Sequence, residues 1–311
     1  NDGLLPLSSD VTNLNVFGWD STCPIYGGTG SAGSHSDGNV SILQSLQDAG
    51  YKTNETLSNM YTEYCAERPT ISMSAQDWSL PEPNMKHYTD DIMNEAMGSV
   101  FSFTAGFIYQ KKKSRKNALT PANWRYMNAT YTNNGSYDDF EEGESYLEPS
   151  VTEEQLIEKV CSEFDNVIVV INANNTMELD WVDNYEQIKS VILAPGAGET
   201  GFTALGEILN GTVNPSGKTA DTYVKNLLST HYINNIGNFP YTNVDDLKAQ
   251  ALAADSSYKG NVSFVNYVEG IYVGYKFYET AADEGLIDYE SSVQYPFGYG
   301  LSYTTFDKTM T

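Results

Sequence analysis

The chain has 311 residues, of which 40% are hydrophobic and 13% aromatic, enough for a substantial buried core. Its 17 basic residues are outnumbered by 41 acidic ones, and the net charge of -24 argues against nucleic acid or an anionic membrane surface as a partner. Three widely spaced cysteines and three histidines disfavour a disulfide framework and a zinc site, so we expect neither a metal nor another cofactor.

No run of the sequence approaches the roughly 18 apolar residues of a membrane-spanning helix. The chain begins Asn1-Asp2-Gly3, without a methionine or a signal-like apolar segment, and is expected to be an excised piece whose compartment the sequence does not reveal. Strong acidity with 23 tyrosines is compatible with binding neutral polyols such as sugars, although a merely soluble surface explains the charge equally well.

The first unit reads as a strand, a glycine-rich loop and a helix. A short apolar run at Asn15–Phe17 precedes the loop Tyr26–Gly33, and residues 39–49 show the spacing of an amphipathic helix that Gly50 ends. A second short helix is predicted over residues 55–64. The loop therefore lies where an α/β protein passes from strand to helix.

The loop Tyr26–Gly33 reads YGGTGSAG and is the first candidate for a binding site. Glycine at such a place indicates either that a ligand or another backbone comes too close for a Cβ, or that φ must be positive. Open α/β sheets bind their ligands at the carboxyl ends of the strands. A flexible surface loop accounts for the glycines equally well.

The part from about residue 65 to 150 is irregular and is expected to be an excursion from the sheet, with no domain of its own. Residues 100–109 alternate aromatic and smaller side chains, which predicts a strand. Directly after it, Lys111–Lys116 carries five basic residues in an otherwise acidic chain, and an acidic run follows at residues 138–144.

From residue 152 onwards, helices and apolar strands alternate. Thr152 and Gln155 are read as a capping box for a helix whose buried face ends near Phe164. Uninterrupted apolar strands between helices predict an α/β fold, a mostly parallel sheet with helices on both faces. The expected elements are strand 167–171, a helical turn 181–185, strand 190–193, a glycine-rich turn 195–198, helix 200–209 and strand 219–224.

Other chemistries have weaker support. Gly217-Lys218-Thr219 invites a phosphate-loop interpretation, but Thr212 stands where that loop needs its first glycine. The Ser-x-Gly patterns lack a nucleophile elbow, and three histidines give little support to a hydrolase triad. Paired carboxylates are what glycoside hydrolysis needs, but any acidic protein has them.

Taken in order, several segments resemble the α/β-sandwich domain of glycoside hydrolase family 3, the β-glucosidase type. The order and spacing match from about residue 3 to residue 306, so the whole chain, 1–311, is expected to form a single domain of this type. The segments are the Tyr26–Gly33 loop, Val167–Asn172, Gly211–Thr219, Val268–Glu279 and Pro296–Phe306.

The resemblance implies a retaining, two-step hydrolysis of a β-glucoside or oligosaccharide. An aspartate on a separate (β/α)₈ barrel attacks the anomeric carbon, and a glutamate of the sandwich domain acts as acid and then as base. The sugar lies between the two domains. The implied substrate-binding residues are Tyr26, Gly28, Thr29, Gly30 and Ser31.

Two departures from the family pattern matter. The catalytic barrel is absent from this chain, and Asp77, in a segment similar to the barrel signature, is not taken as the nucleophile. The family's Gly-Glu-Gly-x-Asp turn is also missing after the strand at 100–109, where Lys111–Lys116 stands instead. We therefore assign no catalytic glutamate, and Glu141, Glu142 and Glu144 lack the matching context.

These departures leave two interpretations open. Residues 98–119 are expected to differ from the segment the family's enzymes use, through a frame error or a degenerate copy, with a genuine basic surface insertion as the alternative. A chain that has lost its acid/base glutamate would be a non-catalytic sugar-binding or interaction module. Family members place the barrel before the sandwich or, in circularly permuted members, after it. The insertion Pro69–Pro83 and the acidic loop before Glu148 look more like the permuted group, but the sequence does not decide the order.

Overall fold

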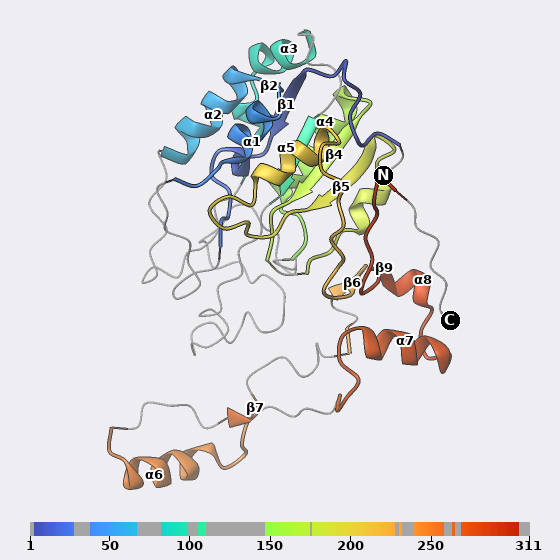
Figure 1. Cartoon of the computed structure of the whole chain (residues 1–311). Coiled ribbons are helices and arrows are strands. Elements are labelled where there is room, and N and C mark those ends of the chain that lie inside the picture. Colours follow the sequence, from blue (N-terminus) through green and yellow to red (C-terminus); the bar gives the residue numbers. More distant parts are fainter. Residues whose placement is uncertain are drawn as a thin grey trace.

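The computed structural model describes residues 3–27, 38–66, 82–98, 105–109, 147–174, 176–227, 230–231, 239–257, 263–264 and 269–304. At its centre is a five-stranded sheet of order β2-β1-β3-β4-β5, in which all neighbouring strands are parallel (Figure 1). The strands are β1 (Asn13–Phe17), β2 (Lys52–Thr53), β3 (Ala105–Tyr109), β4 (Val167–Ile171) and β5 (Ile188–Leu193).

Strand β4 shows why the sheet is covered on both faces. All five of its residues are buried, and successive side chains belong to different cores because a strand alternates its side chains between the faces. Ile168 and Val170 pack in the core beneath α1 (Ile42–Asp48) and α5 (Thr203–Leu209). Val167, Val169 and Ile171 pack in the core beneath α2 (Glu55–Ala66), α3 (Asp90–Gly98) and α4 (Val151–Glu163). The predicted α/β class is confirmed.

Side-chain caps fix where the helices begin. The Ser41 side chain accepts from the Gln44 backbone at the start of α1, and Gly50 (φ 97°) follows its end, as predicted. The capping box of α4 is formed by Ser150 and Glu153, so the predicted pair Thr152 and Gln155 is wrong by two residues. The Glu153 carboxylate accepts a hydrogen bond from the Ser150 backbone N–H at 2.6 Å.

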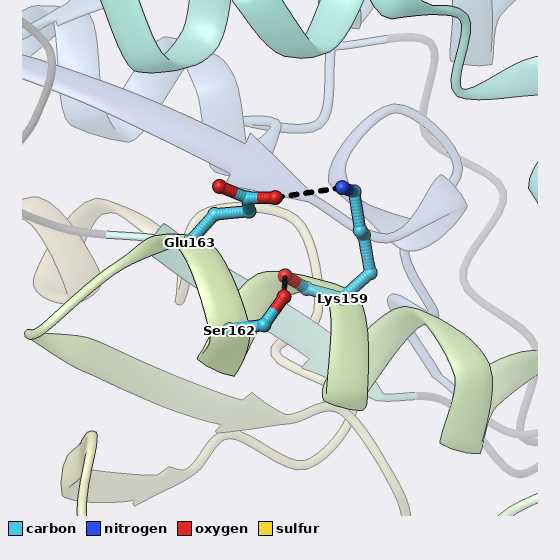
Figure 2. Close-up of polar contacts among 3 residues, drawn as sticks. All are labelled: Lys159, Ser162 and Glu163. Atoms are coloured by element: carbon cyan, nitrogen blue, oxygen red, sulfur yellow. Dashed lines mark hydrogen bonds and ion pairs between the residues drawn. The ribbon is translucent and has the colours of Figure 1, made fainter.

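The last turns of α4 carry a surface ion pair. Lys159 Nζ lies 2.7 Å from Glu163 Oε1, four residues further along the helix, and the Ser162 hydroxyl donates to the Lys159 carbonyl at 2.7 Å (Figure 2). Such an exposed pair at this spacing is worth only about 0.3–0.5 kcal/mol. The stability of α4 therefore comes from its buried face.

A smaller unit follows α5. Two short antiparallel pairs join β6 (Tyr223–Val224) to β9 (Val293–Tyr295) and β7 (Phe239–Pro240) to β8 (Ser263–Phe264). Three helices accompany them: α6 (Val244–Ala254), α7 (Tyr275–Asp283) and α8 (Tyr289–Ser292). In Figure 1, α6 and β7 lie away from the central sheet, and α6 has no buried residue. A third core joins Val224, Leu227, Tyr278 and Val293.

Two predicted segments differ from the structure. The strand expected at 219–224 is reduced to β6, because the Thr219 backbone and hydroxyl bond to the segment 296–299 and not to a sheet. The range 65–150, expected to be an excursion, contains α3 and the central strand β3. The basic run Lys111–Lys116 and the acidic run 138–144 lie outside the described residues. Among the helices that are described, none has the length and hydropathy needed to cross a bilayer.

Candidate functional site

The strand order places one topological switch point in the sheet. From β1 the chain goes to β2 on one side, whereas β3, β4 and β5 lie in succession on the other side. Open α/β sheets bind ligands outside the carboxyl ends of the strands at such a point, here between β1 and β3. The chain leaves β1 at Phe17 and runs directly into the segment that leads to Tyr26.

The first turn after β1 is held by a buried network. Gly18 (φ 96°) donates its N–H to the Tyr61 hydroxyl at 2.8 Å, and the Trp19 N–H donates to the Glu82 carboxylate at 3.2 Å. The Tyr88 hydroxyl donates to the same carboxylate at 2.5 Å and lies 2.7 Å from the Tyr61 hydroxyl. Burial raises the pKa of Tyr61 and of Tyr88, so both stay neutral hydrogen-bonding groups.

Asn172, the residue directly after β4, fastens the next part of the loop to the sheet. Its Oδ1 accepts from the Ile25 N–H at 2.7 Å, and its Nδ2 donates to the Ile25 carbonyl at 3.3 Å and to the Ala194 carbonyl at 2.8 Å. The side chain has no exposed surface. One buried amide thus links the segment that follows β1, residues 18–27 (here called the β1 loop), to the carboxyl ends of β4 and β5.

Tyr26 is positioned by its backbone and by its ring. Its carbonyl accepts from the Gly198 N–H at 2.6 Å, and its ring meets the edge of Phe202 with centroids 5.7 Å apart. Burial, followed by the nearby Cys23, raises the pKa of the Tyr26 hydroxyl. A Cβ on Gly196 would lie 3.0 Å from the Gly27 Cα, so a larger residue here would push two closely approaching backbones slightly apart.

Of the predicted binding residues, the structure places Tyr26 at this edge of the sheet. Gly28, Thr29, Gly30 and Ser31 lie outside the described residues, and their roles stay predictions. The sequence-based site did not include Asn172 or Asn174, whose Oδ1 accepts from the Gly196 N–H at 2.7 Å. A usable signal was present, since both asparagines follow an unbroken apolar strand at its carboxyl end.

A cavity lined by described residues lies elsewhere along the same sheet. It has a volume of about 1120 Å³ and runs beside β5, the segment 213–221 and the tyrosines near the end of the described chain. Asn174 reaches it, but Tyr26 does not line it. The topology and the loop contacts therefore identify the candidate site better than the volume does.

The segment Gly217-Lys218-Thr219 makes hydrogen bonds to another part of the chain. The Lys218 ammonium donates to the Gly300 carbonyl, and the Thr219 hydroxyl donates to the Pro296 carbonyl at 2.6 Å. A phosphate loop needs these two groups for phosphate and magnesium. In this structure both groups instead bond to backbone carbonyls of the segment 296–300.

Glu178 is a buried carboxyl group whose pKa is raised. Burial, opposed by a hydrogen bond from the Leu227 N–H and reinforced by Glu148 and Asp180, raises its pKa to about 7. Because it bonds to a backbone amide below β6, we interpret it as a structural group. No cluster of three potential metal ligands occurs among the described residues.

A family comparison decides the relationship that the motifs and the fold indicate. The sequence model of the family described as "Glycosyl hydrolase family 3 C-terminal domain" matches residues 1–303. The chain belongs to this family. The resemblance read from the sequence is confirmed, and the parallel sheet is the fold of this C-terminal domain.

Several of the relatives are β-glucosidases. A β-glucosidase of Ruminococcus albus is 27% identical over 311 residues, which are 99% of this chain and 27% of the relative. β-Glucosidase A of Butyrivibrio fibrisolvens is 36% identical over 167 residues, 54% of this chain and 17% of the relative. The solved structure of a Paenibacillus barengoltzii β-glucosidase superimposes with a TM-score of 0.70 at 25% identity, covering 98% of this chain and 28% of that one. The chain thus spans under a third of these proteins.

Proposed function

We propose that this family 3 domain forms the substrate-capping part of a retaining β-glucosidase-type hydrolase. The observation that supports it is the course of the β1 loop. Asn172 and the Gly198 N–H hold Ile25 and Tyr26 over the carboxyl ends of the strands, where ligands bind in open α/β sheets. The predicted sugar-binding residues Gly28–Ser31 follow directly in the sequence, and we propose that they contact the sugar at this edge.

In the proposed reaction, an aspartate on a (β/α)₈ barrel of the parent protein attacks the anomeric carbon. A covalent glycosyl-enzyme intermediate forms while a carboxylic acid protonates the leaving oxygen, and the same group then activates water. This chain contributes hydrogen bonds that orient the terminal sugar. A lone domain without the nucleophile cannot form the intermediate, so the 311-residue chain is expected to be inactive.

The decisive assay uses the full-length parent and a chromogenic aryl β-glucoside. Replacing Ser31 by alanine removes one polar contact, worth about 1 kcal/mol, and should lower kcat/KM about fivefold. Gly30→Val should do more damage, because a side chain there blocks the sugar or the backbone conformation. Ser257→Ala, at an exposed site after α6, is the matched control and should leave kcat/KM unchanged. Unchanged kinetics in both loop variants would exclude the loop from the site.

A second function, a non-catalytic sugar-binding module, is favoured by one observation. The family's acid/base turn is missing after β3, and Lys111–Lys116 stands in its place. Turnover of the aryl β-glucoside by the full-length parent would remove this alternative. Absent turnover together with retained binding of glucose would support it.

A further inference from the structure

Two cysteines, one in the β1 loop and one in α2, lie close to the same threonine hydroxyl group. Cys23 follows the short helix η1 (Trp19–Ser21), and Cys65 lies in the last turn of α2. The Thr22 hydroxyl lies 4.0 Å from the Cys23 sulfur and 3.8 Å from the Cys65 sulfur, so both sulfur atoms contact one hydroxyl group. Neighbouring elements thus present two sulfur atoms to one another.

The surroundings hold this pair in place. Tyr61 lies one turn before Cys65 on the same face of α2, and its hydroxyl accepts from the Gly18 N–H at 2.8 Å. The helix is therefore fastened to the turn that carries Cys23. Both cysteines are only half-buried, so small reagents can reach them, whereas Cys161 on α4 is 4% exposed.

The chemistry of the two thiols differs. The hydrogen bond from Cys65 lowers the pKa of Cys23 to about 7, although burial opposes it, so Cys23 is the better nucleophile near neutral pH. The pKa of Cys65 is raised, first by its hydrogen bond to Cys23 and then by burial. Burial raises the pKa of Cys161 to about 12, which leaves this thiol unreactive.

We propose that Cys23 and Cys65 form a redox-active dithiol site that a small-molecule disulfide converts into an intramolecular disulfide. The Cys23 thiolate attacks one sulfur of the small disulfide, forming a mixed disulfide and releasing one thiolate. Cys65 then loses its proton and attacks the Cys23 sulfur, releasing the second thiolate. Two protein thiols are oxidised to one disulfide, and the small disulfide is reduced to two thiols that take up the two protons.

The site is a modification site separate from the sugar chemistry, and it does not depend on the proposed function. Cys23 lies three residues before Tyr26, so the bond would join the start of the candidate loop to the end of α2. A disulfide between these positions would close a chain loop from η1 to α2 and restrict the unfolded state.

The test equilibrates the native 311-residue chain with glutathione buffers of increasing oxidised fraction. The chain is then unfolded in guanidinium chloride containing N-ethylmaleimide, so that the buried Cys161 is also labelled, and intact mass and peptide mapping are recorded. We expect one disulfide that joins the Cys23 and Cys65 peptides and one remaining label, on Cys161. Reduction with dithiothreitol should restore three labels.

Matched variants separate the two steps of the reaction. Cys65→Ser should stop at the glutathione mixed disulfide on Cys23, Cys23→Ser should form neither product, and Cys161→Ser should behave as the wild type. At pH 7, Cys23 should be alkylated at least tenfold faster than Cys161. Three labels at every glutathione ratio, a bridge that includes Cys161, or a wild-type mixed disulfide that never resolves would each overturn the proposal. Peptide mapping of the wild-type chain tests the proposal even if a variant fails to fold.

Discussion

Asn172 offers the most direct test of how the β1 loop is held. Replacing it by alanine removes hydrogen bonds of 2.7, 2.8 and 3.3 Å, so the buried Ile25 N–H and carbonyl and the part-buried Ala194 carbonyl lose this partner. A hydrogen bond contributes about 1 kcal/mol net, and a buried group left unpaired costs about 1–3 kcal/mol. Because the 3.3 Å contact is weak, we expect the free energy of unfolding to fall by about 2–4 kcal/mol.

The measurement is urea denaturation of the 311-residue chain, followed by circular dichroism. Asn174→Ala is the matched control, because its amide makes one hydrogen bond, to the Gly196 N–H, and is exposed. We expect the control to cost less than about 1 kcal/mol. Asn172→Asp keeps the acceptor but puts a buried carboxylate oxygen against the Ile25 and Ala194 carbonyl oxygens, so its effect should be at least as large as that of alanine. If Asn172→Ala and Asn174→Ala differ by less than about 0.5 kcal/mol, the link between the loop and the sheet is not a stabilising one.

Three further predictions concern packing, charge and the surface. A Cβ on Gly206 of α5 would lie 2.2 Å from a backbone carbonyl of α1, so Gly206→Ala should destabilise the chain by about 1–3 kcal/mol in urea denaturation, whereas Gly217→Ala, with open space, should not. The pKa of Glu178, raised to about 7, means that the wild type loses stability as the pH rises from about 4.5 through 7. Glu178→Gln should therefore be more stable than the wild type by about 1–2 kcal/mol at pH 8 and about equal to it at pH 4, and a constant difference across this range would contradict the assignment. Lys159→Ala should change the free energy of unfolding by less than about 0.5 kcal/mol, and a loss above 1 kcal/mol would show that its pair with Glu163 is more than a surface contact.

Much of the central sheet could be predicted because its pattern is unbroken. The apolar residues of β4 and β5 and the amphipathic spacing of α1, α2, α4 and α5 gave their positions to within a few residues. The helical turn expected at 181–185 is η5 (Asp180–Asn184). The central sheet and the helices that cover it thus follow the periodic patterns of apolar residues in the sequence.

The predictions failed where local rules compete with partners distant in sequence. The pattern at 219–224 is that of a strand, but the Thr219 N–H donates to the Tyr299 carbonyl at 2.7 Å, so its backbone is paired with a turn. The helices α3, α6, α7 and α8 were not predicted. Helix α6 buries no residue, and α8 is only four residues long, so neither leaves a clear apolar stripe in the sequence.

The candidate site could be predicted only in part. Glycines mark the loop in the sequence, but nothing local shows that Asn172 meets Ile25 across 147 positions or that Gly196 meets Gly27. Such contacts depend on strand order, since β1 and β4 are separated in the sheet by β3. Strand order is a long-range property that single-sequence patterns do not contain.

The place of β3 in the middle of the sheet has a consequence for assembly of the domain. Its Ala105 pairs with Asn15 on one side and with Val167 on the other, so both of its neighbours come from distant parts of the chain. Closing such long loops is slow, and folds dominated by non-local pairing fold slowly. The added entropy of a longer loop is small, because each doubling of its length costs only about 0.6 kcal/mol. Lengthening the connections on either side of β3, by evolution or by engineering, should therefore change the stability little. The main effect should be a lower folding rate.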